Sequence, residues 1–141
     1  MCYYNVLDLS DYIISKCIKD KKMISNLQLQ KILYYIQKYY LITKGKPAFD
    51  YPIQAWKIGP VVSLVYYKYC GSGAMPIRRI VNENYRQIHE LNIKDKAFID
   101  KIIEEKRELS PWKMSADVNK KDGAWDRVFK KGKGNHNIIP L

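Results

Sequence analysis

The sequence predicts a mainly α protein: a compact bundle of about five to six helices with a small two- or three-stranded β element. Apolar side chains recur at helical spacing in several segments, glycine and proline separate these segments, and one stretch between them has an extended composition. The chain has 141 residues, 47% of them hydrophobic, which suffices for one packed core. No internal repeat or long linker divides it, so we expect a single domain over residues 1–141.

The first helix is predicted from about Val6 or Asp8 to Asp20, because apolar side chains recur on one face of this segment. An aspartate near the start suits the positive end of the helix dipole, and lysines gather near the other end, where cations are favoured. The apolar face consists of Val6, Leu9, Ile13 and Cys17.

The second helix has the clearest signals in the sequence. Ser25 and Gln28 have the spacing of a capping box, which marks a helix start. Gly45 supplies a natural C-terminal stop. Lys31 and Lys38 are expected on the face opposite the apolar stripe, which consists of Leu29, Ile32, Leu33, Ile36 and Tyr40. This segment should be the central helix of the fold.

An extended segment is expected over residues 51–58, where Pro52 restricts it to a sheet edge or a strand start. Gly59 and Pro60 then punctuate the chain, and Pro60 suits the first turn of a third helix that continues to Tyr69. A second short strand is predicted over residues 77–81, pairing with the first.

Three more helices complete the prediction. Asn92 and Asp95 cap the fourth, whose apolar stripe includes Ile99 and Ile103, and Ser110 with Pro111 opens the fifth. Trp125 and Val128 mark a short last helix. Residues 127–141 form a basic tail that is expected to be loose, with residues 138–141 either docking back on the fold or fraying.

The formal net charge is +11, and the basic residues are unevenly distributed. Residues 21–82 contain one acidic residue, Asp50, and ten basic residues. The basic residues are Lys21, Lys22, Lys31, Lys38, Lys44, Lys46, Lys57, Lys68, Arg78 and Arg79. Such a field attracts an acidic protein or a nucleic acid, or it serves only solubility. For nucleic acid, the lysines and tyrosines of the second helix and the Arg78–Arg79 pair are the candidate contacts; alternatively, these tyrosines pack helix against helix.

The sequence offers little for catalysis, and we expect no enzyme. His89 and His136 are the only histidines, and both lie in polar segments. Cys17 lies on the apolar face of the first helix, where burial suppresses thiol reactivity. No metal-ligand spacing or phosphate loop is present, so we expect no metal and no cofactor.

Three scattered cysteines fit a reducing compartment rather than a disulfide framework. No apolar run is long enough to span a membrane, and the first residues lack the pattern of a signal peptide. We therefore expect a cytoplasmic protein without membrane association.

Two separated motifs resemble the SocA-like, or Panacea-domain, family. Residues 25–37 (SNLQLQKILYYIQ) resemble its signature helix, and Gly45-Lys46-Pro47 and residues 55–62 (AWKIGPVV) follow at the expected distance. In the second half, Met114-Ser115 corresponds to the family's Leu-Ser pair. Asn119 stands where the family has histidine, and Ala124 precedes Trp125 where the family has proline.

The resemblance implies an antitoxin of a bacterial or phage toxin–antitoxin pair that neutralises its toxin by direct binding, in some members as an adaptor for a protease. Two alternatives remain at this stage: a phage-encoded inhibitor of a host defence protein such as a CRISPR effector, and a basic nucleic-acid-binding regulator. The sequence specifies neither the toxin nor an oligomeric state.

We assign partner binding and structural roles to two sets of residues. The partner-binding candidates are Lys31, Tyr34, Tyr35, Lys38, Trp56 and Lys57. The structural residues of the family motif are Leu29, Leu33, Gly59, Pro60 and Trp125. The rings of Trp56 and Trp125 are expected to contribute to the core as well, since aromatic side chains at such turns usually pack inside.

Overall fold

The computed structural model describes residues 4–80 and 93–141, apart from the side chains of residues 93, 94, 111 and 112. This part of the chain forms six α-helices and a three-stranded sheet, so the mainly α prediction with a small β element is confirmed. The elements are α1 (Val6–Lys19), α2 (Asn26–Lys44), β1 (Gln54–Trp56), β2 (Gly59–Val61), α3 (Ser63–Lys68), the 3₁₀ turn η1 (Cys70–Ser72), α4 (Ile93–Lys106), α5 (Pro111–Val118), α6 (Ala124–Phe129), the 3₁₀ turn η2 (Lys130–Gly132) and β3 (Asn137–Ile138).

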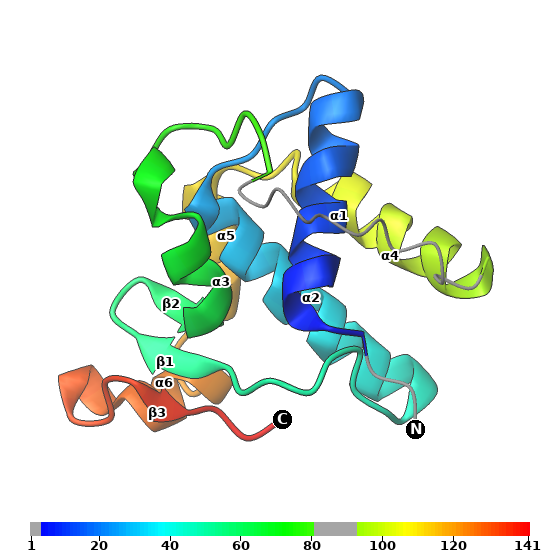
Figure 1. Cartoon of the computed structure of the whole chain (residues 1–141). Coiled ribbons are helices and arrows are strands. Elements are labelled where there is room, and N and C mark those ends of the chain that lie inside the picture. Colours follow the sequence, from blue (N-terminus) through cyan, green and yellow to red (C-terminus); the bar gives the residue numbers. More distant parts are fainter. Residues whose placement is uncertain (1–3, 81–92) are drawn as a thin grey trace.

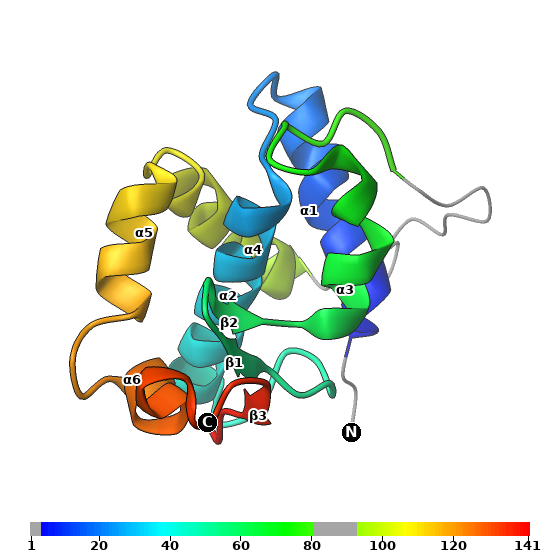
Figure 2. The ribbon, with the colours of Figure 1, turned by 90° about the vertical axis from the view of Figure 1, so that its left-hand side faces the viewer.

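Helix α2 lies at the centre of the molecule, as predicted. Figures 1 and 2 show α1 and α3 on one side of it, α4 and α5 on the other, and the sheet with α6 at one end. Nine consecutive residues of α2, from Leu29 to Gln37, are buried, because neighbours cover the helix on several sides. A helix surrounded in this way needs apolar side chains over more than one stripe.

The starts of the helices follow local sequence signals. Ser25 and Gln28 form the predicted capping box of α2, and Gly45 ends this helix with a left-handed φ of 67°. The side chain of Ser110 accepts a hydrogen bond from the backbone N–H of Lys113 and caps α5. The cap predicted at Asn92 lies outside the described residues.

Two predictions between α2 and α4 are wrong. Gly59 and Pro60 do not open a helix; they belong to β2, and α3 begins only at Ser63. Pro60 is tolerated because β2 is the edge of the sheet, where a missing N–H leaves no ladder partner unsatisfied. The strand predicted over residues 77–81 is absent from its described part, residues 77–80.

The sheet has the order β2-β1-β3, and both pairs are antiparallel. Its third strand comes from the C-terminal segment that we expected to be loose. The backbone N–H of Ile139 donates to Ile53 at 2.7 Å, and the Ile139 side chain is only 3% exposed. Of the two alternatives for residues 138–141, docking is therefore the one that the structure shows at Ile138 and Ile139.

A buried ion pair ties α1 to α3. Asp11 is fully buried, and both of its carboxylate oxygens accept hydrogen bonds from the Lys68 ammonium at 2.8–2.9 Å. The Tyr69 hydroxyl also donates to this carboxylate. A buried carboxylate needs such partners, because an unpaired charge in a protein interior is costly.

Among the described residues, no helix has the length and hydropathy of a membrane span.

Candidate partner-binding surface

Helix α2 holds the chain between residues 48 and 66, which contains β1, β2 and the start of α3, through buried polar side chains. Gln37 accepts the backbone N–H groups of Ala48 and Phe49 and donates to the carbonyl of Phe49. Gln30 accepts the N–H of Val62 at 2.9 Å. These amides satisfy backbone groups that lack partners in regular secondary structure, so the polar residues of the signature helix have a structural role.

Asn26 extends this network toward α3. Its Nδ2 donates to the carbonyl of Tyr66 at 3.0 Å, and its Oδ1 accepts from Gln30 at 3.0 Å. The two residues are one helical turn apart, so they support each other along the same face of α2.

Lys31 is also buried, against our expectation of an exposed face shared with Lys38. Its side chain has no exposed surface, and its Nζ donates to the carbonyl of Ile58 at 2.9 Å. No carboxylate of the described residues pairs with it. Burial lowers the pKa of Lys31 from 10.5 to about 8, because the interior disfavours the charged ammonium.

The turn between β1 and β2 is fitted closely around this ammonium. Gly59 has a φ of 120°, and a Cβ at this position would lie 2.8 Å from Lys31 Nζ and 2.9 Å from Asn119 Oδ1. Only glycine satisfies both constraints. The Asn119 Oδ1 is buried and has no hydrogen-bond partner among the described residues. Asn119, at the position where the resemblance expects histidine, therefore lies at the end of α5 and next to the β1–β2 turn.

Helix α6 is attached to the same turn. The indole Nε1 of Trp125 donates to the carbonyl of Trp56 at 2.7 Å. Ala124 is the first residue of α6, a position at which proline is also favoured. The departure from the family's Pro-Trp pair therefore leaves the helix start in place.

A groove runs beside this framework between α2, α5 and α6, and we call it the α2–α5–α6 groove. Its volume is about 370 Å³. The lining residues are Tyr34, Lys38, Asp117, Val118, Lys120, Asp122, Gly123, Ala124, Arg127 and Leu141. The groove thus combines apolar area with side chains of both charges.

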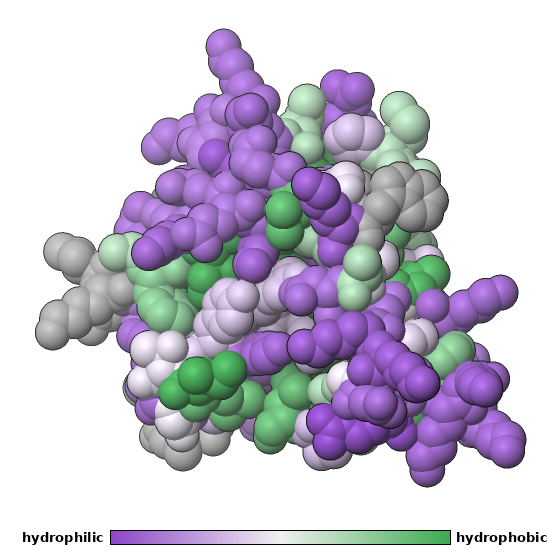
Figure 3. Space-filling view, turned by 180° about the vertical axis from the view of Figure 1, so that it is seen from behind, coloured by the Kyte–Doolittle hydropathy of each residue, from purple (hydrophilic) through white to green (hydrophobic). Residues whose placement is uncertain are grey.

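The face that α4, α5 and α6 present has two strongly hydrophilic regions with a paler strip between them (Figure 3). Within the groove, Tyr34 is mostly buried, and burial together with the nearby Asp117 carboxylate raises its pKa. Lys38 is half-buried, whereas Asp117 and Arg127 are exposed. The charged groups at the groove are therefore accessible, and the aromatic ring beneath them is held by packing.

The structure brings only part of the predicted binding set to one place. Tyr34 and Lys38 line the groove. Lys31 and Tyr35 are buried, so the expectation that they lie on the exposed surface is wrong; the Tyr35 hydroxyl donates to Asp117. Lys57 is exposed at the β1–β2 turn, outside the groove.

Trp56 belongs mainly to the packing of the sheet. It is 9% exposed, and its ring stacks on His136 with centroids 4.4 Å apart and contacts Tyr66 at 5.1 Å. Of the structural set, Leu29 and Leu33 are fully buried, Gly59 and Pro60 are buried in β2, and Trp125 is partly buried against the core.

Candidate groups for catalysis are not brought together in the described residues. Cys17 is fully buried, and burial raises the pKa of its thiol, as expected from the apolar face of α1. No group of His, Cys, Asp and Glu side chains in the described part of the chain could hold a metal ion. His89 lies outside the described residues.

Sequence reasoning missed Asp117 and Arg127 of the groove, and it missed the buried amides of α2. A signal for the amides was present: Gln30 and Gln37 are seven residues apart, on a helix face that also carries Leu33. A polar residue repeated within an apolar face indicates a partner in the interior. No comparable signal marks the groove residues, because they converge from segments far apart in the chain.

Comparisons with known proteins agree with this framework. The family model described as "Antitoxin SocA-like, Panacea domain" matches residues 29–126. The chain is also similar to antitoxin SocA of Caulobacter vibrioides (strain NA1000 / CB15N), with 44% identity over 50 residues. These residues make up 36% of this chain. The matched region spans 27% of that relative's length, about a quarter.

No solved structure matches the chain. The family match extends from Leu29 in α2 to Asp126 in α6, and it includes β1 and β2, whose turn and flanking chain the buried polar side chains of α2 hold. Because the family model covers more than half of the chain, this protein belongs to the SocA-like antitoxin family, whose members share the Panacea domain.

Proposed function

We propose that this protein is an antitoxin that neutralises a protein toxin by direct binding in the cytoplasm, without a catalytic step. The observation that carries the proposal is the family match over residues 29–126, supported by the relative named antitoxin SocA. The α2–α5–α6 groove is the proposed binding surface. Delivery of the toxin to a protease is a further possibility for this family, and the same binding step would precede it.

The groove supports protein binding more than nucleic-acid binding. Lys38 and Arg127 lie on the same surface as Asp117 and Asp122. A surface with both signs of charge pairs with a complementary protein, whereas a nucleic-acid surface is predominantly basic. Apolar contacts from Leu141, which is half exposed, would add buried area in a complex.

The direct test is co-expression of the chain with each neighbouring gene of its source genome, with growth as the readout. We expect one neighbour to be toxic alone, to be harmless with the chain, and to co-purify with it. If no neighbour is toxic and none co-purifies, the antitoxin proposal is wrong.

Groove variants test the binding surface separately. Lys38→Glu with Arg127→Glu should abolish neutralisation and weaken the complex by at least tenfold, because opposite charges now face the partner. Lys101→Glu with Lys113→Glu makes the same change in net charge at exposed positions outside the groove. Equal neutralisation by the two variants would place the interface elsewhere.

The net charge of +11 favours a second candidate, a nucleic-acid-binding regulator. This function predicts gel-shift affinity for DNA or RNA that falls steeply with salt. An inhibitor of a host defence protein would bind through the same kind of surface as an antitoxin, and the neighbouring genes would distinguish the two: defence or anti-defence genes in place of a toxin.

A further inference from the structure

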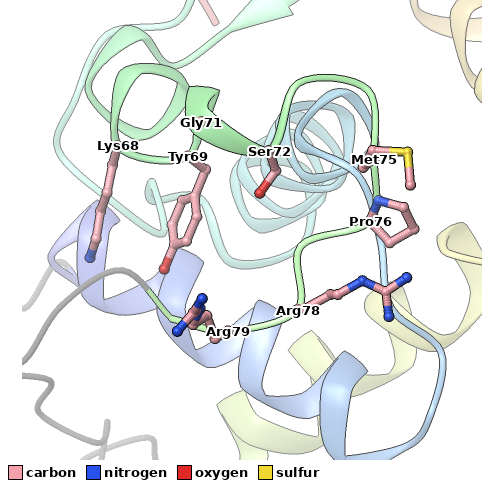
Figure 4. A pocket seen from close by; sticks show the side chains of 8 residues that line it. All are labelled: Lys68, Tyr69, Gly71, Ser72, Met75, Pro76, Arg78 and Arg79. Carbon is pink, nitrogen blue, oxygen red and sulfur yellow. The ribbon is translucent and has the colours of Figure 1, made fainter.

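A second, basic pocket lies on α3, η1 and the chain that follows. Its volume is about 480 Å³, and Lys68, Ser72, Met75, Pro76, Arg78 and Arg79 are among its lining residues. Figure 4 shows the Ser72 hydroxyl directed toward the segment that carries the two arginines, with the Arg79 guanidinium below Tyr69 and the Arg78 guanidinium below Pro76. We call it the Arg78–Arg79 pocket.

The backbone beneath this pocket is anchored to the core. The N–H of Ile77 donates to the carbonyl of Ile24 at 2.7 Å, and the Ile77 side chain is 1% exposed. The N–H of Met75 donates to the carbonyl of Ser72 at 3.0 Å. Arg78 and Arg79 therefore project from a fixed point, and their ordering on binding costs less than it would from a free loop.

The positive charge of the pocket comes from the two arginines. The charge of Lys68 is offset by the buried carboxylate of Asp11. Arg78 and Arg79 are exposed; among the residues that the structure describes, they form no ion pair and no acidic side chain lines the pocket. Exposed guanidinium groups that have no acidic partner can bind carboxylates or phosphates through paired N–H donors.

The other lining residues favour a peptide over a nucleic acid. Met75 is 61% exposed and lies beside Pro76, so the rim offers apolar contacts for an aliphatic side chain. Binding of single strands usually uses exposed rings on which bases stack. Among the described residues that line the pocket, Tyr69 is the one with an aromatic ring; it is 1% exposed and its hydroxyl donates to Asp11. The pocket has room for a few side chains, and its two arginines do not form a continuous row of positive charge along which a nucleic-acid backbone could lie.

We propose that the Arg78–Arg79 pocket binds an acidic segment of the protein partner, with the two guanidinium groups pairing with its carboxylates and Met75 contacting a neighbouring aliphatic side chain. The inference rests on the proposed function, because it assumes a protein partner. It adds a second contact site on the α3 side of the molecule and a chemical requirement on the partner: aspartate or glutamate next to leucine, isoleucine or valine.

Fluorescence polarisation tests the pocket without knowledge of the partner. The probes are a fluorescein-labelled peptide of alternating aspartate and leucine, the same peptide with asparagine replacing aspartate, and a labelled single-stranded oligonucleotide. The proteins are the wild type, Arg78→Gln with Arg79→Gln, and the matched control Lys130→Asn with Lys131→Asn. The control removes two charges from exposed positions whose φ values of 49° and 55° asparagine tolerates.

We expect the acidic peptide to bind the wild type about tenfold more tightly than the asparagine peptide, because two charge-assisted hydrogen-bond pairs are lost in the latter. The arginine variant should lose about the same factor, and the tail control should stay within about twofold. Addition of the acidic peptide should also shift the NMR signal of the Met75 methyl group in the wild type.

Three outcomes would overturn the inference: equal affinity for the two peptides, equal losses in the arginine and tail variants, or displacement of the peptide by an oligonucleotide that binds more tightly through the same arginines. The arginines are exposed, so both variants should unfold at the wild-type temperature, and circular dichroism checks this. If neutralisation survives in the arginine variant but not in the groove variant, the pocket inference fails while the antitoxin proposal stands. If no neighbour is toxic, the antitoxin proposal fails, and the peptide measurements still decide whether the pocket binds acidic segments.

Discussion

Replacement of Lys31 by methionine should stabilise the protein at neutral pH and lose that advantage in alkali. The ammonium is fully buried, has no carboxylate partner among the described residues, and has a pKa lowered by burial from 10.5 to about 8. At about 1.4 kcal/mol per pKa unit, keeping it charged costs the native state about 3 kcal/mol. Methionine has a similar length and no charge, so it fills the same space.

The substitution also removes the hydrogen bond to the carbonyl of Ile58, which then lacks this donor at a cost of about 1–2 kcal/mol. The net gain of Lys31→Met at pH 7 is therefore about 1–2 kcal/mol. This gain raises the unfolding temperature by a few degrees, at about 3 °C per kcal/mol for a domain of this size.

The pH dependence follows from the direction of the pKa shift. Below pH 8 the lysine is protonated in both states, and the full penalty acts on the wild type. Between pH 8 and 10.5 the native state has released the proton while the unfolded state still binds it, so the stability of the wild type rises with pH. By pH 10 the wild type should equal or exceed the methionine variant.

Urea unfolding monitored by circular dichroism at several pH values between 7 and 10 measures this difference. Lys38→Met is the matched control on the same helix, at a half-buried position of the groove, and the pH dependence of Lys31→Met is read relative to this variant. A difference for Lys31→Met that does not change over this range would show that the Lys31 ammonium is not held uncompensated in the interior.

Three further substitutions test other parts of the framework. Gly59→Ala should cost about 2–4 kcal/mol in urea unfolding, because it adds a clash with a buried ammonium to an unfavourable φ of 120°. The control Gly71→Ala has open space at its Cβ and should change stability by less than about 0.5 kcal/mol. Equal losses in the two variants would contradict the close fit at Gly59. Trp125→Phe keeps an aromatic ring but removes the pyrrole part of the indole with its Nε1 donor to the carbonyl of Trp56, and thermal unfolding should show a loss of at least about 1–2 kcal/mol; an unchanged transition would mean that the bond contributes nothing. Burial alone would raise the pKa of Asp95, but hydrogen bonds from Lys44 and Tyr4 lower it to about 2. Asp95→Asn should therefore cost about 2 kcal/mol at pH 7, and this difference should shrink as the pH falls from 4 to 2; a constant difference across this acid range would refute the assignment.

Local signals in the sequence were sufficient for most helices. The capping box at Ser25 and Gln28, the stop at Gly45 and the Ser110-Pro111 start act through contacts within one helical turn. Such contacts depend little on the rest of the fold, so they can be identified from neighbouring residues alone. The order and spacing of the two motifs likewise indicate the family from the sequence alone.

The candidate site was only partly predictable for the same reason. Tyr34 and Lys38 were found from their spacing on α2, but their partners in the groove come from residues 117–127 and from Leu141. Lys31 has the same spacing relative to the apolar stripe as an exposed lysine would. Its burial depends on the β1–β2 turn, which places the carbonyl of Ile58 against its ammonium.

By itself, the sequence determined most of the helices, the caps at Ser25 and Ser110, the apolar stripe of α2 and the membership of an antitoxin family. Only the tertiary structure decided that α2 is covered on several sides, that its amides and Lys31 bind backbone groups of residues 48–66, that Pro60 lies in an edge strand, and that the C-terminal segment completes the sheet. The physical reason is that each of these features satisfies backbone or charged groups with partners distant in sequence. Pattern along the chain shows which groups need a partner, and packing alone determines which partner they find.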